Sequence, residues 1–279
     1  MRRLLISGAG GFVGARAMRM LCDQFEVHSF PKGMLAKAGE AEVADVISAI
    51  KPDVILHAAA ISDTGYSEAH PEESYRANVS LPVWMARGAM LSGAKLVCFS
   101  SDQVYTGLAD NGPFAEDVSL HPANVYGRHK LEAEQRVLDI SPDAVMLRAT
   151  WMYDFPCCDL PTHVNLLVRM MRAASCGESL SFSDADYRGI TYVRHAIAAL
   201  PTVFSLLGGV YNFGSENSLS MYETALDFAK ALGIRLDINR TGFKRSLAID
   251  CSKLRQHGIV LDNTQDGLRR CMRDYGLNP

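Results

Sequence analysis

The regular alternation of short apolar runs with longer amphipathic stretches constrains the fold of this sequence more than any other feature. The amphipathic stretches include 43–50 and 71–92, and the apolar runs occupy residues 4–7, 26–29, 54–57, 96–100 and 145–148. Short apolar runs between turn signals are typical of strands, and parallel strands need crossover connections such as helices. The order therefore predicts right-handed βαβ units in a doubly wound parallel sheet, an α/β fold of the Rossmann type.

The alternation weakens after Arg148, which indicates a second part of the chain. The segment "WMYDFPCCDLPTH" is loop-like and contains two prolines, and a strand pattern returns at 210–213. We expect a larger domain over residues 1–150 and a smaller C-terminal lobe over 151–279. The segment 186–213 is a candidate for return to the first domain.

The composition narrows the class of ligand. The 28 basic and 31 acidic residues give a net charge of −3, which offers no general electrostatic reason to bind nucleic acid or an anionic membrane. Pro201 and Gly208-Gly209 interrupt the charge-poor run 196–215, which predicts a buried helix, a turn and a strand instead of a membrane span. The seven cysteines lack a Cys-x-x-Cys pair or a zinc-ligand spacing, which fits a reducing cytoplasm. We expect a small polar or phosphorylated ligand.

A glycine-rich turn follows the first predicted strand directly. In "GAGGFVG", residues 8–14, Gly8, Gly11 and Gly14 keep a three-residue spacing. Glycine permits the tight turn and lets the backbone approach a pyrophosphate, while the helix N-terminus supplies amides and a partial positive charge. A flexible turn is the alternative, but the position after the first strand favours dinucleotide binding.

Small and hydroxyl-bearing residues end the third and fourth predicted strands. "HAAA", residues 57–60, leaves room for an extended ligand across the sheet or allows close helix packing. "FSSDQVY" places Ser100, Ser101 and Asp102 at the same edge of the sheet. The two serine hydroxyls could donate to a substrate oxygen or cap the following turn.

The stretch "NVYGRHK" holds Tyr126 and Lys130 four residues apart. On a helix these positions share a face, so the phenol and the ammonium can occupy one small volume. A solvated surface pair is one interpretation. The other is that the cation lowers the phenol's pKa from about 10 toward a value useful for proton transfer.

In this order and spacing the motifs resemble the extended short-chain dehydrogenase/reductases, and among them the dTDP-4-dehydrorhamnose reductases and related sugar-nucleotide-binding proteins. The resemblance extends over roughly the whole chain, through "YNFGSENSLSMYETALDFAKALG". It implies NAD(P)H-dependent reduction of a keto group on a nucleotide-activated sugar. Tyr126 would give its proton to the ketone oxygen as hydride reaches the carbon, Lys130 would hold the ribose hydroxyls, and Ser101 would orient the carbonyl.

The resemblance also implies a set of binding residues. We expect substrate contacts from Asp102, Gln103, Trp151 and Arg188. The residues expected to bind or support the cofactor are Gly8, Gly11, Phe12, Val13, Gly14, Ala58, Ala59, Ala60, Asn78, Tyr126 and Lys130.

The choice between NAD(H) and NADP(H) depends on the end of the second predicted strand. An NAD enzyme usually has an acidic residue there, which accepts from the ribose 2′-hydroxyl. Here the sequence reads "HSFPKG", without an acid, and Ser29 and Lys32 are available to a 2′-phosphate. NADP(H) is therefore mildly favoured, although an exposed loop lysine is the alternative for Lys32.

Three alternatives to reduction differ in how well the residues support them. Sugar-nucleotide dehydratases follow their catalytic hydroxyl with an Asp-Glu pair, whereas this chain has Asp102-Gln103, and a glutamine cannot act as the base for elimination. Epimerisation stays open, since it uses the same hydride machinery. A cofactor-binding regulatory role is the third alternative, because the regulatory subunit of methionine adenosyltransferase resembles this family; the set of Ser101, Tyr126 and Lys130 favours catalysis.

Two arginines bear on metal and substrate binding. Some dehydrorhamnose reductases form a metal-linked dimer through glutamates, one of them two residues after the last loop glycine. Arg16 stands at that place, so we expect no metal, while a homodimer stays compatible with the sequence. Arg188 could clamp a diphosphate through bidentate hydrogen bonds, or form a structural ion pair with Asp184 or Asp186.

Overall fold

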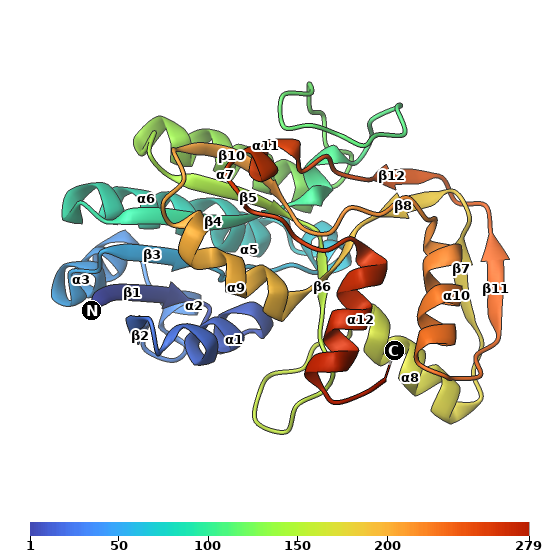
Figure 1. Cartoon of the computed structure of the whole chain (residues 1–279). Coiled ribbons are helices and arrows are strands. Elements are labelled where there is room, and N and C mark those ends of the chain that lie inside the picture. Colours follow the sequence, from blue (N-terminus) through green and yellow to red (C-terminus); the bar gives the residue numbers. More distant parts are fainter. Residues whose placement is uncertain (279) are drawn as a thin grey trace.

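The computed structural model describes residues 1–278 and has a six-stranded parallel sheet at its centre (Figure 1). The strand order is β10-β5-β4-β3-β1-β2. The strands are β1 (Arg2–Ser7), β2 (Phe25–Ser29), β3 (Val54–His57), β4 (Lys95–Ser101), β5 (Val145–Ala149) and β10 (Gly209–Phe213). The prediction of a doubly wound parallel sheet is confirmed, and the five apolar runs of the first half become its strands.

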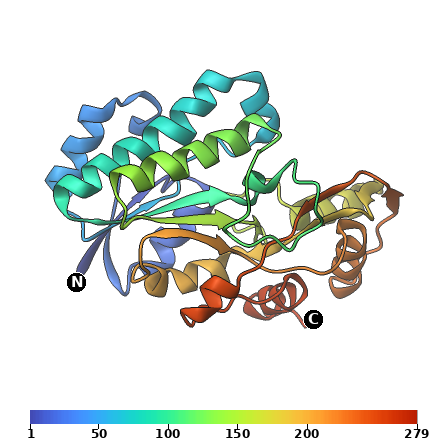
Figure 2. The ribbon, with the colours of Figure 1, turned by 90° about the horizontal axis from the view of Figure 1, so that it is seen from above.

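Helices cover both faces of this sheet (Figure 2). Against one face pack α3 (Glu40–Ile50), α6 (Leu81–Ser92) and α7 (Val125–Ile140), and against the other α1 (Phe12–Leu21) and α9 (Val193–Val203). Successive strand residues point to opposite faces, so Leu4 and Ile6 enter one core and Leu5 enters the other. Burial on both faces explains why these strands read as continuous apolar runs.

The segment from 71 to 92, expected as one helix, is divided by a π-helical turn. Pro71–Tyr75 (α5) leads into Arg76–Ser80 (η1), which continues into α6. The loop before α5 contains the short helix Thr64–Ala69 (α4), and the connection between β2 and α3 contains another, Met34–Lys37 (α2). A π-helical turn inserts a residue into the ladder of helix hydrogen bonds and is frequent at functional sites.

The C-terminal lobe lies beyond the carboxyl ends of the central strands (Figure 1). It contains three parallel strand pairs, β6–β9, β7–β11 and β8–β12. Its elements are β6 (Trp151–Tyr153), α8 (Leu166–Cys176), β7 (Leu180–Ser183), β8 (Asp186–Arg188), β9 (Ile190–Tyr192), α10 (Met221–Ala231), β11 (Ile238–Thr241), β12 (Arg245–Leu247) and α12 (Thr264–Asp274). Helix α11 (Ser252–Gln256) packs instead beside β10 of the central sheet. A separate apolar core around Tyr153, Phe228 and Leu268 holds the lobe together.

The charge-poor run 196–215 forms most of α9, a turn and strand β10, as the interruptions at Pro201 and Gly208-Gly209 indicated. Across residues 1–278, none of the helices combines the length and apolarity that a bilayer crossing requires.

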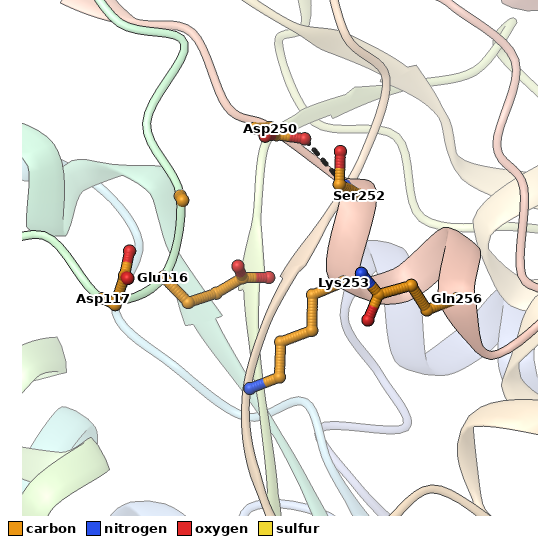
Figure 3. Close-up of a pocket in the computed structure, with 7 residues that line it drawn as sticks. Glu116, Asp117, Asp250, Ser252, Lys253 and Gln256 are labelled. Carbon is orange, nitrogen blue, oxygen red and sulfur yellow. Dashed lines mark hydrogen bonds between the residues drawn. The ribbon is translucent and has the colours of Figure 1, made fainter.

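Side chains close the outer edge of β10. The Glu116 carboxylate accepts from the Asn212 amide at 2.7 Å, and the Lys253 ammonium donates to the Val210 carbonyl at 2.7 Å. Both side chains line a pocket that is completed by Ala115, Asp117, Asp250, Ser252 and Gln256 (Figure 3). Glu116 and Lys253 already form hydrogen bonds with the backbone of β10. We therefore interpret these side chains as covering the exposed edge of the sheet.

Candidate active site

Ser101, Tyr126 and Lys130 come together at the carboxyl edge of the sheet. Ser101 ends β4, and the two others lie on the first turns of α7, whose N-terminus is capped by Asn124 accepting from the Gly127 amide at 2.6 Å. Tyr126 is 6% exposed and Lys130 is 4% exposed. The helix prediction is confirmed, and the solvated surface pair is wrong, since both side chains are buried.

Burial controls the charge of Lys130. Its Nζ donates to the Phe99 carbonyl at 3.0 Å and lies 5.7 Å from the centre of the Tyr126 ring. Burial lowers the pKa of the ammonium to about 8, while Cys98 and the Glu134 carboxylate act in the opposite direction. Lys130 therefore changes its charge close to neutrality.

The Tyr126 phenol shows a shift opposite to the expected one. Burial raises its pKa above the ordinary value; hydrogen bonding with Ser101 opposes this shift and the charge of Asp102 adds to it. The expectation that Lys130 would lower this pKa is thus wrong for this arrangement, because loss of solvent around the phenolate dominates. Tyr126 holds its proton firmly at neutral pH.

Asp102 connects Ser101 with the lobe. It begins the short 3₁₀ helix Asp102–Tyr105 (η2), where its Oδ1 accepts from the Ser101 hydroxyl at 3.2 Å and its Oδ2 accepts from Arg188 Nη2 at 2.9 Å. The Arg188 guanidinium lies 5.4 Å above the Trp151 ring. Arg188 and Trp151, both expected to contact substrate, therefore meet near the Ser101 hydroxyl.

The alternative prediction for Arg188, an ion pair with Asp184 or Asp186, is wrong about the partner. Asp184 pairs with Arg240 and Asp186 pairs with Arg245, so neither serves Arg188. The actual partner, Asp102, lies 86 residues away in the sequence.

Gln103 has its side chain turned toward the start of α7. Its Oε1 accepts from Asn124 Nδ2 at 3.0 Å, and its backbone amide donates to the Ser101 hydroxyl at 3.2 Å. Gln103 thus supports the position of Ser101 and of the α7 N-terminus. Position 103 therefore has no carboxylate that could act as the base for dehydration.

The glycine loop divides into structural and open positions. Gly8 has a φ of +72°, and a Cβ there would lie 2.7 Å from the Ala59 amide nitrogen; a Cβ on Gly14 would lie 2.1 Å from the Gly8 carbonyl oxygen. These two glycines are required by close backbone packing. A Cβ on Gly11 would lie 3.2 Å from the same oxygen, and one on Gly10 would meet nothing within 4 Å.

The N-terminus of α1 fits a phosphate group. Gly11 is its N-cap residue, and no side chain caps this end of the helix. The helix begins at Phe12 and Val13, so amides of its first turn stay available to an anion, and the helix dipole favours negative charge there. This is the position that the glycine spacing predicted for a pyrophosphate.

Ser7 fixes the backbone at the end of β3. Its hydroxyl lies 2.7 Å from His57 Nδ1 and accepts from the Ala58 and Ala59 amides at 3.1 and 3.3 Å. Burial and then the charge of Lys130 lower the pKa of His57 to about 3, so this imidazole is neutral. Ala58 and Ala59 are half-buried and Ala60 is exposed. Because their side chains are small, they leave space above this edge of the sheet.

Asn78 lies in the π-helical turn. Its Nδ2 donates to the Ile61 carbonyl at 3.0 Å and to the Ser74 hydroxyl at 3.1 Å, whereas its Oδ1 is buried and has no partner within residues 1–278. A buried acceptor without a donor calls for a ligand or water. This finding suits the supporting role expected of Asn78.

Ser29 and Lys32 are exposed at the carboxyl end of β2. Within the described residues, neither side chain forms a hydrogen bond or an ion pair. A hydroxyl and a cation are therefore free at the position where a 2′-phosphate would lie in a dinucleotide bound across this sheet.

Glu134 was missed by the sequence reasoning. It follows Lys130 by one helical turn and forms a buried ion pair with Arg148, at 2.8 Å between Oε2 and Nη2, while also accepting from the Ser100 hydroxyl. The pair fixes α7 against β4 and β5. The spacing of Tyr126, Lys130 and Glu134, four residues each, was the available signal.

Arg16 forms a second buried ion pair between the two parts of the chain. Its Nε lies 2.6 Å from Asp154 Oδ2, and Nη1 donates to the Pro161 carbonyl at 2.9 Å. The side chain thus joins α1 to the start of the lobe. Residues 1–278 contain no cluster of three or more His, Cys, Asp or Glu side chains suited to a metal ion.

Comparisons with known proteins agree with this geometry. The family described as RmlD substrate binding domain matches residues 1–272. The dTDP-4-dehydrorhamnose reductase of Aggregatibacter actinomycetemcomitans is 28% identical over 235 residues, covering 81% of this chain and 78% of that protein. Methionine adenosyltransferase 2 subunit beta of Xenopus laevis is 27% identical over 285 residues, covering 92% and 83%.

Solved structures show the same fold. A dTDP-4-dehydrorhamnose reductase from Bacillus anthracis, in complex with NADP, superposes with a TM-score of 0.88 at 23% identity and covers 98% of this chain and 99% of its own. A UDP-glucose 4-epimerase from Thermotoga maritima, with UDP-glucose, gives a TM-score of 0.83 at 17% identity, with 98% of both chains covered.

Proposed function

This chain belongs to the RmlD substrate binding domain family, and from that premise we propose that it reduces a keto group on a nucleotide-activated sugar with NAD(P)H. The observation that carries the proposal is the buried grouping of Ser101, Tyr126 and Lys130 at the carboxyl edge of the sheet, beside an uncapped α1 N-terminus. In open α/β sheets this edge is where ligands bind. The dTDP-4-dehydrorhamnose reductases among the sequence relatives and among the similar structures support the same chemistry.

Tyr126, Ser101 and Lys130 have separate roles in the proposed reaction. A bound nicotinamide supplies the hydride. Tyr126 keeps its proton at neutral pH and donates it to the ketone oxygen, and Ser101 orients that oxygen by a hydrogen bond. Lys130, when protonated, holds the ribose hydroxyls through its ammonium group.

The cofactor proposal is NADP(H) in preference to NAD(H). It is supported by the exposed Ser29 and Lys32, by the absence of an acid between them, and by the NADP complex of a reductase with this fold. Calorimetry should show tighter binding of NADPH than of NADH. Lys32→Ala should narrow this difference, and equal affinities in the parent protein would count against the proposal.

The substrate proposal is a nucleoside diphosphate sugar bound in the lobe. Arg188 supplies a guanidinium for the diphosphate, and Trp151 and Asp102 lie beside it. We assign dinucleotide binding to residues 1–150 and substrate binding to 151–279. Of the segment 186–213, α9 and β10 belong with the first domain, whereas β8 and β9 pair with strands of the lobe. The absence of a carboxylate at Gln103 argues against dehydration.

A cytoplasmic location and a homodimer belong to the same proposal. All seven cysteines are free thiols, which suits a reducing compartment. The sugar-nucleotide substrates proposed here call for neither a membrane nor a nucleic acid. Light scattering of the purified protein tests the dimer, since a monomer mass would reject it.

The experiment is an assay of NADPH oxidation with a panel of 4-keto nucleotide sugars. A reductase consumes NADPH in proportion to the ketone, and Tyr126→Phe removes most of that rate. Cofactor binding without oxidation across the panel would favour the regulatory alternative, which the similarity to methionine adenosyltransferase subunit beta keeps in view. Interconversion of sugars without net oxidation would instead indicate epimerisation.

A further inference from the structure

Asp102 has one carboxylate oxygen for each of two partners with different tasks. Oδ1 accepts from the Ser101 hydroxyl at 3.2 Å, and Oδ2 accepts from Arg188 Nη2 at 2.9 Å. The side chain is 2% exposed, so the interactions with these groups replace water. The buried Asp102 carboxylate holds both Ser101 and Arg188 in place. Loss of either partner would leave the negative charge of Asp102 without full compensation.

Arg188 depends on Asp102 for its orientation. It reaches the sheet edge from β8 of the lobe, its side chain is 12% exposed, and its Nε is buried without a partner. In the part of the chain that the structure describes, Asp102 is its single ion-pair partner; the Trp151 ring supports one face. One guanidinium edge is held by Asp102, and the remaining donors can meet an anion.

Ser101 has a single proton to donate. In this structure Asp102 accepts that proton at 3.2 Å, the hydroxyl also lies within hydrogen-bonding reach of Tyr126, and the Ser101 oxygen accepts from the Gln103 amide. The carboxylate that holds Arg188 therefore influences the direction in which the Ser101 hydroxyl donates. Arg245, the nearby arginine of β12, is engaged with Asp186 and does not replace this link.

We propose that Asp102 is a positioning residue that couples the anion-binding guanidinium of Arg188 to the catalytic hydroxyl of Ser101. The inference rests on the proposed function, since Arg188 is taken to meet the diphosphate and Ser101 the ketone. Occupation of one end of the site then affects the alignment at the other through a single carboxylate. The remote diphosphate group thereby contributes to turnover as well as to binding.

The first test uses thymidine diphosphate, which has the diphosphate but no keto sugar. Calorimetry should show that Asp102→Ala weakens its binding by about tenfold, the scale of a lost hydrogen bond to a charged group, because Arg188 loses its orientation. In an Arg188→Met background, Asp102→Ala should leave binding unchanged or strengthen it, since only a repelling charge is then removed. Asp102→Ala should therefore weaken thymidine diphosphate binding in the parent protein but not in the Arg188→Met variant.

Two results would overturn the inference. Asp102→Ala that strengthens binding in the parent would make Asp102 a competitor for Arg188, and equal weakening in both backgrounds would show that it does not act through Arg188. Arg240→Met is the matched control, because this exposed arginine of the lobe pairs with Asp184 and lies outside the site. It should leave binding unchanged.

The second test leaves Asp102 in place and therefore does not depend on the folding of its variant. Arg188→Met should raise KM and also lower kcat severalfold in the parent, whereas in a Ser101→Ala background it should raise KM with little change in kcat. An equal fall of kcat in both backgrounds would contradict the coupling. If no ketone is reduced by the parent, the proposed function fails, and the thymidine diphosphate measurement still decides whether Asp102 positions Arg188.

Discussion

At the scale of residues, burial acts on Tyr126 and Lys130 in opposite directions. It raises the pKa of the phenol and lowers the pKa of the ammonium to about 8. Ketone reduction requires an acid that still holds its proton when the carbonyl arrives, and a buried phenol meets this need. The sequence spacing correctly placed both side chains together, but the direction of the phenol's shift depends on burial, which spacing does not reveal.

Tyr126→Phe keeps the ring and removes the transferable proton. Turnover should fall by about 10²–10⁴-fold, the scale of general acid-base catalysis, while the affinity for NADPH stays within experimental error of the parent. Steady-state kinetics and a fluorescence titration with NADPH measure the two quantities. Parent-like turnover would remove Tyr126 from the proposed mechanism.

The affinity for NADPH should depend on the charge of Lys130. Its lowered pKa means that Lys130 is protonated below about pH 8 and neutral above it. NADPH binding to the free protein should therefore weaken as pH rises through about 8, by up to about tenfold per pH unit for one coupled proton. Lys130→Met should bind more weakly and lose this transition. A parent profile that stays flat from pH 7 to pH 9 would contradict the assignment.

The glycine loop allows a matched comparison of two neighbouring residues. Gly11→Ala adds a methyl group at the N-cap of α1, facing the loop where the pyrophosphate is proposed to lie, whereas Gly10→Ala adds one in open space. Gly11→Ala should weaken the binding of NADPH by tenfold or more, and Gly10→Ala by much less. Equal affinities, with both variants folded by circular dichroism, would place the cofactor elsewhere.

At the scale of elements, α7 carries Tyr126 and Lys130, the residues proposed to act in catalysis, so the position of α7 on the sheet must be fixed. Tyr126, Lys130 and Glu134 line the buried face of α7, and the ion pair of Glu134 with Arg148 joins that face to β5. The helix itself was visible from the sequence. The ion pair was not, because Arg148 reads as the last residue of a strand and its partner lies on another element.

The stability of the protein should depend on this buried pair much more than on a surface pair of the same helix. Glu134→Ala should lower the free energy of unfolding by about 3–5 kcal/mol, since it leaves Arg148 buried without its counter-ion. Glu132→Ala, at the exposed pair with Arg136, should cost at most about 1 kcal/mol. Denaturant unfolding of both variants measures the difference, and comparable losses would show that the buried pair does not hold α7.

At the scale of the whole molecule, local patterns predicted the sheet and the position of the site, but long-range partners escaped them. The five apolar runs became β1 to β5, and the pattern at 210–213 became β10. The π-helical turn was missed, because the pattern of residues 71–92 is that of one continuous helix. The Arg188–Asp102 pair was missed because nothing in local spacing relates a lobe arginine to a residue 86 positions earlier.

The most direct test of the account is the fate of deuterium from NADPH labelled at the transferred position of its nicotinamide. With a dTDP-4-keto sugar as substrate, the account predicts one deuterium in the product, bound to the carbon that carried the ketone, and one oxidised cofactor for each product formed. Tyr126→Phe should form the same product far more slowly. Product without deuterium, or an isomerised sugar with no net cofactor oxidation, would contradict the claim that this chain is a reductase.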